Sequence, residues 1–300
     1  MIYVIANEIS GKGKGAQALK KVQEYLSVRG EEYITFISEY SGHSTLLAER
    51  ACGKDDCEMV IAIGGDGTFS EVLSGMDLNV PIAFVPAGTG NDFAAGAELP
   101  SDAEKAVSDA LSGSAKEFDI LDVNGRRCLN IAGTGFDVNV LLMEEKVRRF
   151  IKNKISYKIA LFLSLISLKF TEIEFKVDGG EKRNLSVLLI AAANGKYYGG
   201  GMPISLDAKC DDGFIDLVII KKLPRIKIPY IFLRFFQGRL KEVTKYVEIH
   251  RCRKVEFSTI NKLPVNIDGE LLSGDEITVE VQPKALRIAC KATSLCEVEC

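Results

Sequence analysis

Ile-Ala-Ile-Gly-Gly-Asp-Gly-Thr-Phe-Ser, residues 61–70, places a buried strand, three glycines and the start of a helical pattern in direct succession. Glycines at such a point let backbone N–H groups approach phosphate oxygens, and the N-terminus of the following helix adds positive partial charge. Asp66 lies among these glycines, and its carboxylate would repel phosphate unless a cation lay between them. The pattern therefore predicts a site for phosphate and magnesium. The simpler alternative is a tight turn capped by Thr68.

A second glycine-rich turn follows the next strand. It reads Phe-Val-Pro-Ala-Gly-Thr-Gly-Asn-Asp-Phe and covers residues 84–93. Neighbouring strands of a doubly wound sheet share one crevice at their carboxyl ends, so we expect both loops to face the same ligand. A third turn, Ser-Gly-Lys-Gly-Lys-Gly at 10–15, suggests dinucleotide binding with Glu31 as the ribose acid. Its spacing is GxGxG, however, whereas that motif requires GxGxxG.

The first third of the chain alternates strand-like and helix-like segments. β-branched runs predict strands at 2–6, 33–38, 59–63 and 82–85, and apolar periodicity predicts helices at 16–29, 44–51 and 102–111. This alternation is typical of a parallel α/β sheet.

Beyond about residue 118 the pattern changes to hairpins. Asn124-Gly125, Asp178-Gly179 and Asp268-Gly269 each stand between strand-like runs, which predicts three tight turns. Helical inserts are expected at 144–169 and 229–243, and a last strand at 286–289 is expected to cross back onto the first domain. We therefore expect an α/β domain at 1–120, with the tail from about 286 to 300 packed on it, and a β-rich domain at 121–285.

Composition excludes several classes of protein. The formal charge of the 300 residues is only −3, with acids and bases interleaved, so no global basic field indicates nucleic acid as a partner. Eight cysteines spread over this length, without a signal peptide, favour free thiols in a reducing cytoplasm. The longest apolar stretch, 159–168, is far shorter than the about 20 residues that a membrane span needs.

These motifs resemble the diacylglycerol kinase catalytic-domain family, in particular small bacterial lipid kinases related to sphingosine and ceramide kinases, over nearly the whole chain. Gly-Gly-Asp-Gly-Thr alone is shared with NAD kinases and phosphofructokinases, whereas residues 86–93 are more specific to the lipid kinases. So is the later pattern of Gly-Gly-Gly-Met at 199–202, Asp-Ala at 207–208 and Asp-Asp-Gly-Phe-Ile-Asp at 211–216.

The resemblance implies a nucleotide cleft between an α/β domain and a β-sandwich domain that binds lipid and metal, with ATP and Mg²⁺ as cofactors. The nucleotide contacts it implies are Ser38, Gly64, Gly65, Asp66, Gly67, Thr68, Phe69, Ser70, Gly88, Thr89, Asn91 and Asp92. The metal ligands it implies are the Lys209 carbonyl, the Asp212 side chain and the Phe214 carbonyl, an oxygen set suited to magnesium. Without the resemblance, an Asp-Gly turn before a strand would explain the same residues.

The stretch Val-Asn-Ile-Asp-Gly-Glu at 265–270 carries two carboxylates at a strand end and its turn. A hairpin explains Asp268 but not Glu270, and phosphoryl transfer needs a base near the acceptor hydroxyl. By resemblance, we expect Glu270 to be that base, with Asp268 orienting or replacing it. Asp66 would act on the phosphate side, and it stays a base candidate because related sphingosine kinases keep an aspartate there.

Basic residues surround apolar faces in both helical inserts, which suits docking on an anionic bilayer; core packing with a solvated charged face is the alternative. The expected function is an ATP- and magnesium-dependent kinase for the hydroxyl of a diacylglycerol-like lipid. We expect it in the cytoplasm, peripherally bound to the inner face of the membrane, with a homodimer left open. The alternatives are an NAD kinase-like transferase with a soluble acceptor and an inactive ATP-binding regulator. The sequence does not select the acceptor lipid.

Overall fold

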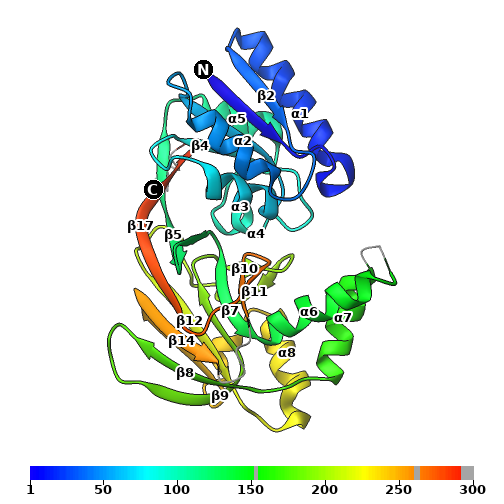
Figure 1. Cartoon of the computed structure of the whole chain (residues 1–300), viewed down its shortest axis with the longest axis vertical. Coiled ribbons are helices and arrows are strands. Elements are labelled where there is room, and N and C mark those ends of the chain that lie inside the picture. The colour runs from blue at the N-terminus through cyan, green and yellow to red at the C-terminus, as the bar shows by residue number, and fades with distance from the viewer. Residues whose placement is uncertain (152–154, 260–263, 292–300) are drawn as a thin grey trace, which may run out of the picture. The chain divides into compact units, whose positions relative to one another are not determined.

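The computed structural model describes residues 1–151, 155–259 and 264–291 (Figure 1). The chain forms two compact units. The first comprises Met1–Asp119 and Pro283–Cys300, and the second comprises Ile120–Gln282. Both boundaries fall inside strands, β5 (Ala115–Val123) and β17 (Ile277–Ala289).

The first unit is a parallel sheet with helices between its strands. Its strand order is β17-β4-β3-β1-β2, and each neighbouring pair runs parallel. The strands are β1 (Ile2–Ala6), β2 (Tyr33–Ile37), β3 (Met59–Gly64), β4 (Ile82–Pro86) and the end of β17. The helices are α1 (Ser10–Arg29), α2 (His43–Cys52), α3 (Asp66–Gly75), α4 (Asp92–Gly96) and α5 (Ala103–Ala110).

Helices cover both faces of this sheet. All five residues of β1 are buried, which requires a layer on either side. Ile2 and Val4 share one apolar core with α1 and α5 residues such as Val22 and Val107. The other pair, α2 and α3, pack against each other, and they contact β1 and β3 respectively. The expectation of a doubly wound parallel domain is confirmed.

The first four predicted strands match within one residue at each end, and the helix prediction at 16–29 was too short. Helix α1 begins at Ser10, but Gly11, Lys12 and Gly13 have φ of 56°, 65° and 88°. This left-handed stretch separates an initial turn from the regular helix, so the apolar periodicity of the regular part begins later than the element itself.

The second unit is built from antiparallel strands. Its path runs β16-β15-β7-β9-β8-β14-β17, with β12 paired to β9 and β13, and β5 paired to β6. The strands not yet given are β6 (Arg126–Cys128), β7 (Ile131–Gly135), β8 (Thr171–Val177), β9 (Arg183–Ala193), β10 (Tyr197–Tyr198), β11 (Met202–Pro203), β12 (Ile215–Lys221), β13 (Val247–Cys252), β14 (Lys254–Thr259), β15 (Val265–Ile267) and β16 (Glu270–Leu272). Each of the three predicted Asp-Gly or Asn-Gly turns joins two strands and has both residues at positive φ, as type I′ turns require.

Two apolar cores lie on opposite faces of this sheet. Leu217 and Ile219 of β12 enter a core made by strands alone, whereas Val218 and Ile220 enter a core shared with helices. The helices are α6 (Phe136–Arg148), α7 (Ile155–Ile166) and α8 (Ile228–Phe236), followed in chain order by the short helix η2 (Leu240–Glu242). A further short helix, η1 (Arg225–Lys227), directly precedes α8. The expected β-rich domain is thus confirmed, with a helical layer on one face.

The two helical inserts have different bounds from those expected. The first begins eight residues earlier, at Phe136, because Gly135 with φ 117° ends β7 directly before the helix. Residues 152–154, between α6 and α7, lie outside the described part. Helix α8 of the second insert ends at Phe236, because Gly238 has a φ of 67° and reverses the backbone. The remainder of the predicted helix forms only the short helix η2. Within the described residues, no helix is long and apolar enough to cross a membrane.

Candidate active site

The three glycine-rich turns of the first unit meet where β1, β3 and β4 end. A Cβ atom on Gly88 would lie 2.4 Å from the Cα of Gly65, and one on Gly11 would lie 2.1 Å from the carbonyl oxygen of Ala87. The amide of Ala87 also donates to the carbonyl of Gly64 at 2.6 Å. Only glycine permits such approaches, so the two main loops lie together and the third turn joins them. That both loops face the same ligand stays a prediction.

One side chain ties the two main loops together, and another braces the second loop internally. The amide of Phe93 donates to Asp66 Oδ1 at 3.2 Å, which ties the start of α4 to the loop after β3. Asn91 Oδ1 accepts from the amide of Gly88 at 2.9 Å. Asp66 thus has a structural contact in addition to its expected role beside phosphate.

Thr68 does not cap α3, so the alternative of a Thr-capped turn is wrong. The helix starts two residues earlier, with Gly65 as its N-cap, which leaves Thr68 inside the first turn and buried. Its hydroxyl accepts from Asn7 Nδ2 at 3.3 Å and lies where a side chain on Gly64 would have to be. The Gly64–Thr68 pair is therefore set by close packing between the strand end and the helix.

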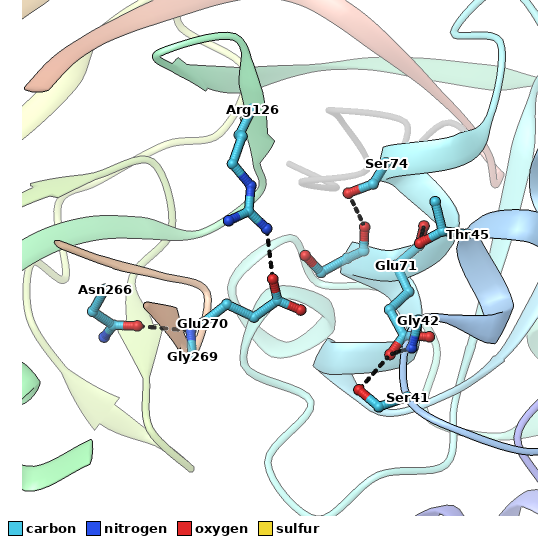
Figure 2. Close-up of polar contacts among 10 residues, drawn as sticks. Ser41, Gly42, Thr45, Glu71, Ser74, Arg126, Asn266, Gly269 and Glu270 are labelled. Atoms are coloured by element: carbon cyan, nitrogen blue, oxygen red, sulfur yellow. Dashed lines mark hydrogen bonds and ion pairs between the residues drawn. The ribbon is translucent and has the colours of Figure 1, made fainter. Parts of the chain in front are cut away.

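Glu71 of α3 organises the neighbouring segment that contains Ser38. Its carboxylate accepts from the amide of Gly42 at 2.8 Å (Figure 2). It also accepts from the amide of Ser44 at 3.3 Å, at the N-terminus of α2. The Ser44 hydroxyl in turn donates to Ser38 Oγ at 3.1 Å. The sequence analysis missed Glu71. The signal was that α2 has glycine as its N-cap, so its first N–H groups need an acceptor from elsewhere.

In the second unit, the Asp268 carboxylate accepts hydrogen bonds from backbone amides. One carboxylate oxygen accepts from the amide of Leu129 at 2.5 Å, and the other accepts from Asn130 at 2.9 Å and Ile131 at 3.0 Å. Burial raises the pKa of Asp268, and these three amide hydrogen bonds oppose that rise. Both oxygens of Asp268 therefore already have partners that join the β15–β16 hairpin to the start of β7.

Glu270 is half-exposed at the start of β16. Its Oε2 forms an ion pair with Arg126 Nη2 at 2.6 Å (Figure 2), and Arg126 opens β6. The preceding amide, of Gly269, donates to Asn266 Oδ1 at 2.8 Å. The guanidinium fixes the position of the Glu270 carboxylate, and the role of Glu270 as the base stays a prediction.

The expected metal ligands lie in the loop before β12. Asp212 Oδ1 accepts from the amide of Phe214 at 3.1 Å, and Asp212 Oδ2 pairs with Arg251 at 2.7 Å. The guanidinium of Arg251 also stacks on the Phe214 ring at 4.3 Å. One carboxylate and two carbonyls are hard donors that fit a magnesium ion with several waters, and Arg251 would compete with that ion for Asp212. Among the described residues, including those around Asp212, no three His, Cys, Asp or Glu side chains are grouped so that they could hold a metal ion.

Two family models together cover the chain. Residues 1–123 match the diacylglycerol kinase catalytic domain. Residues 130–290, more than half of the chain, match the YegS C-terminal NAD kinase beta sandwich-like domain. The chain belongs to the diacylglycerol kinase catalytic-domain family.

Relatives in this family are similar along most of their length. The chain is 28% identical to a diacylglycerol kinase of Staphylococcus carnosus, over 89% of this chain and 87% of the relative. It is 29% identical to a diacylglycerol kinase of Staphylococcus haemolyticus, over 89% and 81%. Among solved structures, a diacylglycerol kinase of Bacillus anthracis has a TM-score of 0.74 at 19% identity, over 98% of each chain. An NAD kinase of Archaeoglobus fulgidus in complex with ATP has a TM-score of 0.56 at 16% identity, over 96% and 93%, which shows a shared fold.

This member of the diacylglycerol kinase family exposes apolar side chains on α8. Ile231 and Phe235 pack into the core, whereas Tyr230, Leu233 and Phe236, spaced three apart, are about half-exposed. Core packing therefore holds for one face of this helix, and docking of the exposed face on a bilayer stays a prediction. Phe162 and Ile166 of α7 are likewise exposed.

The cations around α8 differ in their partners. Arg234 and Arg239 both bond to Glu242, at 3.4 Å and 2.5 Å. Arg225 and Lys227, by contrast, flank Ile226, which is 88% exposed, and no carboxylate partner of theirs is found among the described residues. In the first insert Lys152 and Lys154 lie outside the described residues, as does the side chain of Lys158.

Proposed function

We propose that this protein is an ATP- and magnesium-dependent lipid kinase that phosphorylates the hydroxyl of a diacylglycerol-like lipid at a membrane surface. The observation that carries the proposal is the direct backbone contact between the Gly64–Ser70 and Pro86–Phe93 loops at the ends of β3 and β4. Strand ends that present glycine loops and helix N-termini are suited to phosphates. Membership of a lipid kinase family supports the choice of acceptor class.

The proposal assigns donor binding to the first unit and proton acceptance to the second. The loops, with Ser38, Thr89, Asn91 and Asp92, would hold ATP. Glu270 would take the proton from the acceptor hydroxyl as the phosphoryl group is transferred. Asp268 would orient the hairpin, because both of its oxygens are bonded to backbone amides. Asp66 would lie on the phosphate side.

Magnesium would be held by the Lys209 carbonyl, the Asp212 carboxylate and the Phe214 carbonyl, where it would neutralise negative charge. Hard oxygen donors in the Asp212 turn support this assignment. The Asp212–Arg251 ion pair implies that Arg251 moves aside or shares the carboxylate when the ion binds.

The acceptor would be met at an anionic bilayer by the exposed stripe of Tyr230, Leu233 and Phe236 and by the cations of η1. An exposed apolar stripe beside cations that have no carboxylate partner among the described residues is the pattern of a peripheral membrane surface. This arrangement would keep the protein at the cytoplasmic face of the membrane.

The test is transfer of label from γ-labelled ATP to lipid in mixed anionic vesicles that contain diacylglycerol, with and without magnesium. We expect a labelled phospholipid that mass spectrometry identifies, and no product after chelation. Parallel reactions contain NAD or a total lipid extract. Label on NAD would favour an NAD kinase-like transferase, and ATP binding without turnover on any lipid would favour an inactive regulator.

A further inference from the structure

Asp137, the second residue of α6, is a buried carboxylate that the proposed chemistry does not use. Its side chain is 6% exposed, and Oδ2 accepts from Asn266 Nδ2 at 3.1 Å. Oδ1 is buried and has no hydrogen-bond partner among the described residues. Burial raises the pKa of Asp137 to about 6. Burying a carboxylate costs folding free energy unless its oxygens are paired, so this group calls for an explanation.

Asn266 connects this carboxylate to the hairpin that carries Glu270. Its Nδ2 faces Asp137, and its Oδ1 accepts from the amide of Gly269 at 2.8 Å. An amide side chain can present either end, but an ionised carboxylate accepts only and a backbone N–H donates only. Asp137 and Gly269 therefore allow just one orientation of the Asn266 amide.

Apart from the ion pair with Arg126, the hairpin backbone positions Glu270. β16 has three residues and, among the described strands, pairs only with β15, so Glu270 begins an edge strand. Asp268 ties one side of the turn to backbone, and the Asn266–Gly269 bond ties the other. The carboxylate, the amide and the Gly269 N–H form one continuous chain from α6 to the residue before Glu270.

We propose that Asp137 is a positioning residue: by fixing the Asn266 amide, it holds the Gly269 turn and thereby the place of the Glu270 carboxylate. This inference rests on the proposed role of Glu270 as the base. Neither Asp137 nor Asn266 touches the reacting atoms; they act through Glu270.

The first test exchanges the hydrogen-bond donor and acceptor between Asp137 and Asn266. N266D sets two carboxylates against each other while keeping an acceptor for Gly269, and we expect kcat to fall at least about tenfold with the KM for ATP nearly unchanged. The double variant D137N/N266D restores a donor facing an acceptor, so kcat should return to within about threefold of the parent. A double variant as slow as N266D would overturn the proposal.

The second test asks whether the effect passes through Glu270. In an E270Q background, N266D should lower the remaining kcat by less than about twofold, because the base it positions is already gone. Equal losses in both backgrounds would mean a merely structural role and would overturn the proposal. N139A removes another amide of α6, which bonds to Gly135 instead, and should keep its turnover in either background.

The third test does not depend on kinase activity. Hydrogen exchange at the Gly269 amide should be faster in N266A than in the parent and unchanged in N139A, with melting temperatures recorded for each. If the parent phosphorylates no lipid but the Gly269 amide is still protected by Asn266, the proposed function fails and the hairpin linkage stands. If exchange at Gly269 is the same in N266A and the parent, the linkage itself is wrong.

Discussion

Asp268 and Glu270 are two residues apart and have different surroundings. Asp268 accepts three backbone amides, whereas Glu270 is 55% exposed and pairs with a single guanidinium. Burial raises the pKa of Asp268, but backbone amides occupy both of its oxygens, which are therefore less available to a substrate hydroxyl than those of Glu270. The difference in surroundings therefore favours Glu270 as the base and Asp268 as support.

We expect Glu270→Gln to reduce turnover by at least the roughly 100-fold typical of lost general-base help, because it keeps the size of the side chain and removes its basicity. ATP binding should be unchanged, since the glycine loops belong to the other unit. Single-turnover kinetics with ATP and lipid vesicles measure the chemical step. Asp66→Asn and Asp268→Asn serve as comparisons: near-normal chemistry in Glu270→Gln with collapse in either of these would move the base there.

Asp137 should give the protein an unusual dependence of stability on pH. Its pKa in the folded state is about 6, above the ordinary 3.8, so the folded state holds its proton more tightly than the unfolded state. Stability from this group is full below about pH 4 and is lost as pH rises through about 6.

Asp137→Asn should remove that contribution. Relative to the parent, the variant should gain up to about 3 kcal/mol in free energy of unfolding between pH 4 and pH 7, from about two pKa units at about 1.4 kcal/mol each. Urea unfolding followed by circular dichroism at several pH values measures the difference. A constant difference across this range would show that Asp137 titrates normally. The introduced amide adds an offset that does not vary with pH.

At the scale of elements, the glycine loops form one packed cluster because their backbones are in contact. A Cβ on Gly65 would lie 3.0 Å from the Cα of Gly88 and 3.5 Å from Ser10 Oγ. A side chain there must push one loop from the other, which would remove the backbone N–H groups from the phosphate that we propose they share.

Gly65→Val should therefore abolish measurable ATP binding in calorimetry while the circular dichroism spectrum stays close to that of the parent. Gly67→Ala adds its Cβ to open space and should not lower the melting temperature, which separates crowding from loss of a glycine. Unchanged ATP affinity in Gly65→Val would rule out the loop pair as the nucleotide site.

The η1–α8 region is the second element with a direct prediction. Reversing Arg234 and Arg239 would mainly disturb their bonds to Glu242, so Arg225 and Lys227 are the better probes of membrane attraction. Each cation near an anionic surface contributes about 1 kcal/mol, so R225E/K227E should weaken vesicle binding by about 2 kcal/mol or more, roughly thirtyfold. Flotation with anionic vesicles at several salt concentrations measures it.

K20E/K105E is the matched control for that experiment, since it makes the same change in net charge in the first unit. It should weaken vesicle binding much less. Equal losses in the two double variants would mean that net charge, and not the η1–α8 region, determines binding.

At the scale of the whole molecule, the chain returns to complete its first unit. Ile288 of β17 pairs with Ile82 of β4, and the amide of Lys284 donates to the buried Asp119 carboxylate at 2.8 Å. Leu286, fully buried, lies between these two contacts. The first unit therefore depends on residues about 200 positions away in sequence.

Leu286→Ala should cost about 2–5 kcal/mol in free energy of unfolding, the range for truncating a buried leucine. Chemical denaturation followed by circular dichroism is suitable, because the chain has no tryptophan. Arg287→Ala, on the exposed side of the same strand, should cost less than about 1 kcal/mol. Similar losses in both would contradict a packed strand.

The parts of the fold that sequence predicted well are those fixed by local chemistry. Continuous β-branched runs gave β1, β3 and β4 within one residue, and Asn-Gly or Asp-Gly pairs gave all three hairpins. The last strand was expected only at 286–289, whereas β17 starts at Ile277; Pro283 and the left-handed Lys284 interrupt its pattern.

Parts of the site that depend on distant partners could not be predicted. Arg126 and Glu270 are 144 positions apart, and neither segment carries a local sign of the other. Glu71 and Asn266 are ordinary polar residues until the fold brings α2 and α6 beside them. The glycine loops could be predicted from the sequence, because a close approach of two backbones requires glycine and no other residue replaces it.

Because β17 is the last of the described strands to be synthesised, the first unit is completed only late in translation. Strands β1 to β4 leave the exit tunnel early, yet the strand that covers the β4 edge emerges only after all of the second unit. Until then the nascent first unit presents an unpaired parallel edge, which is open to non-native strand pairing. The second unit can finish folding first, so nucleotide binding should be acquired last during synthesis. Chaperones should protect the exposed β4 edge until that step.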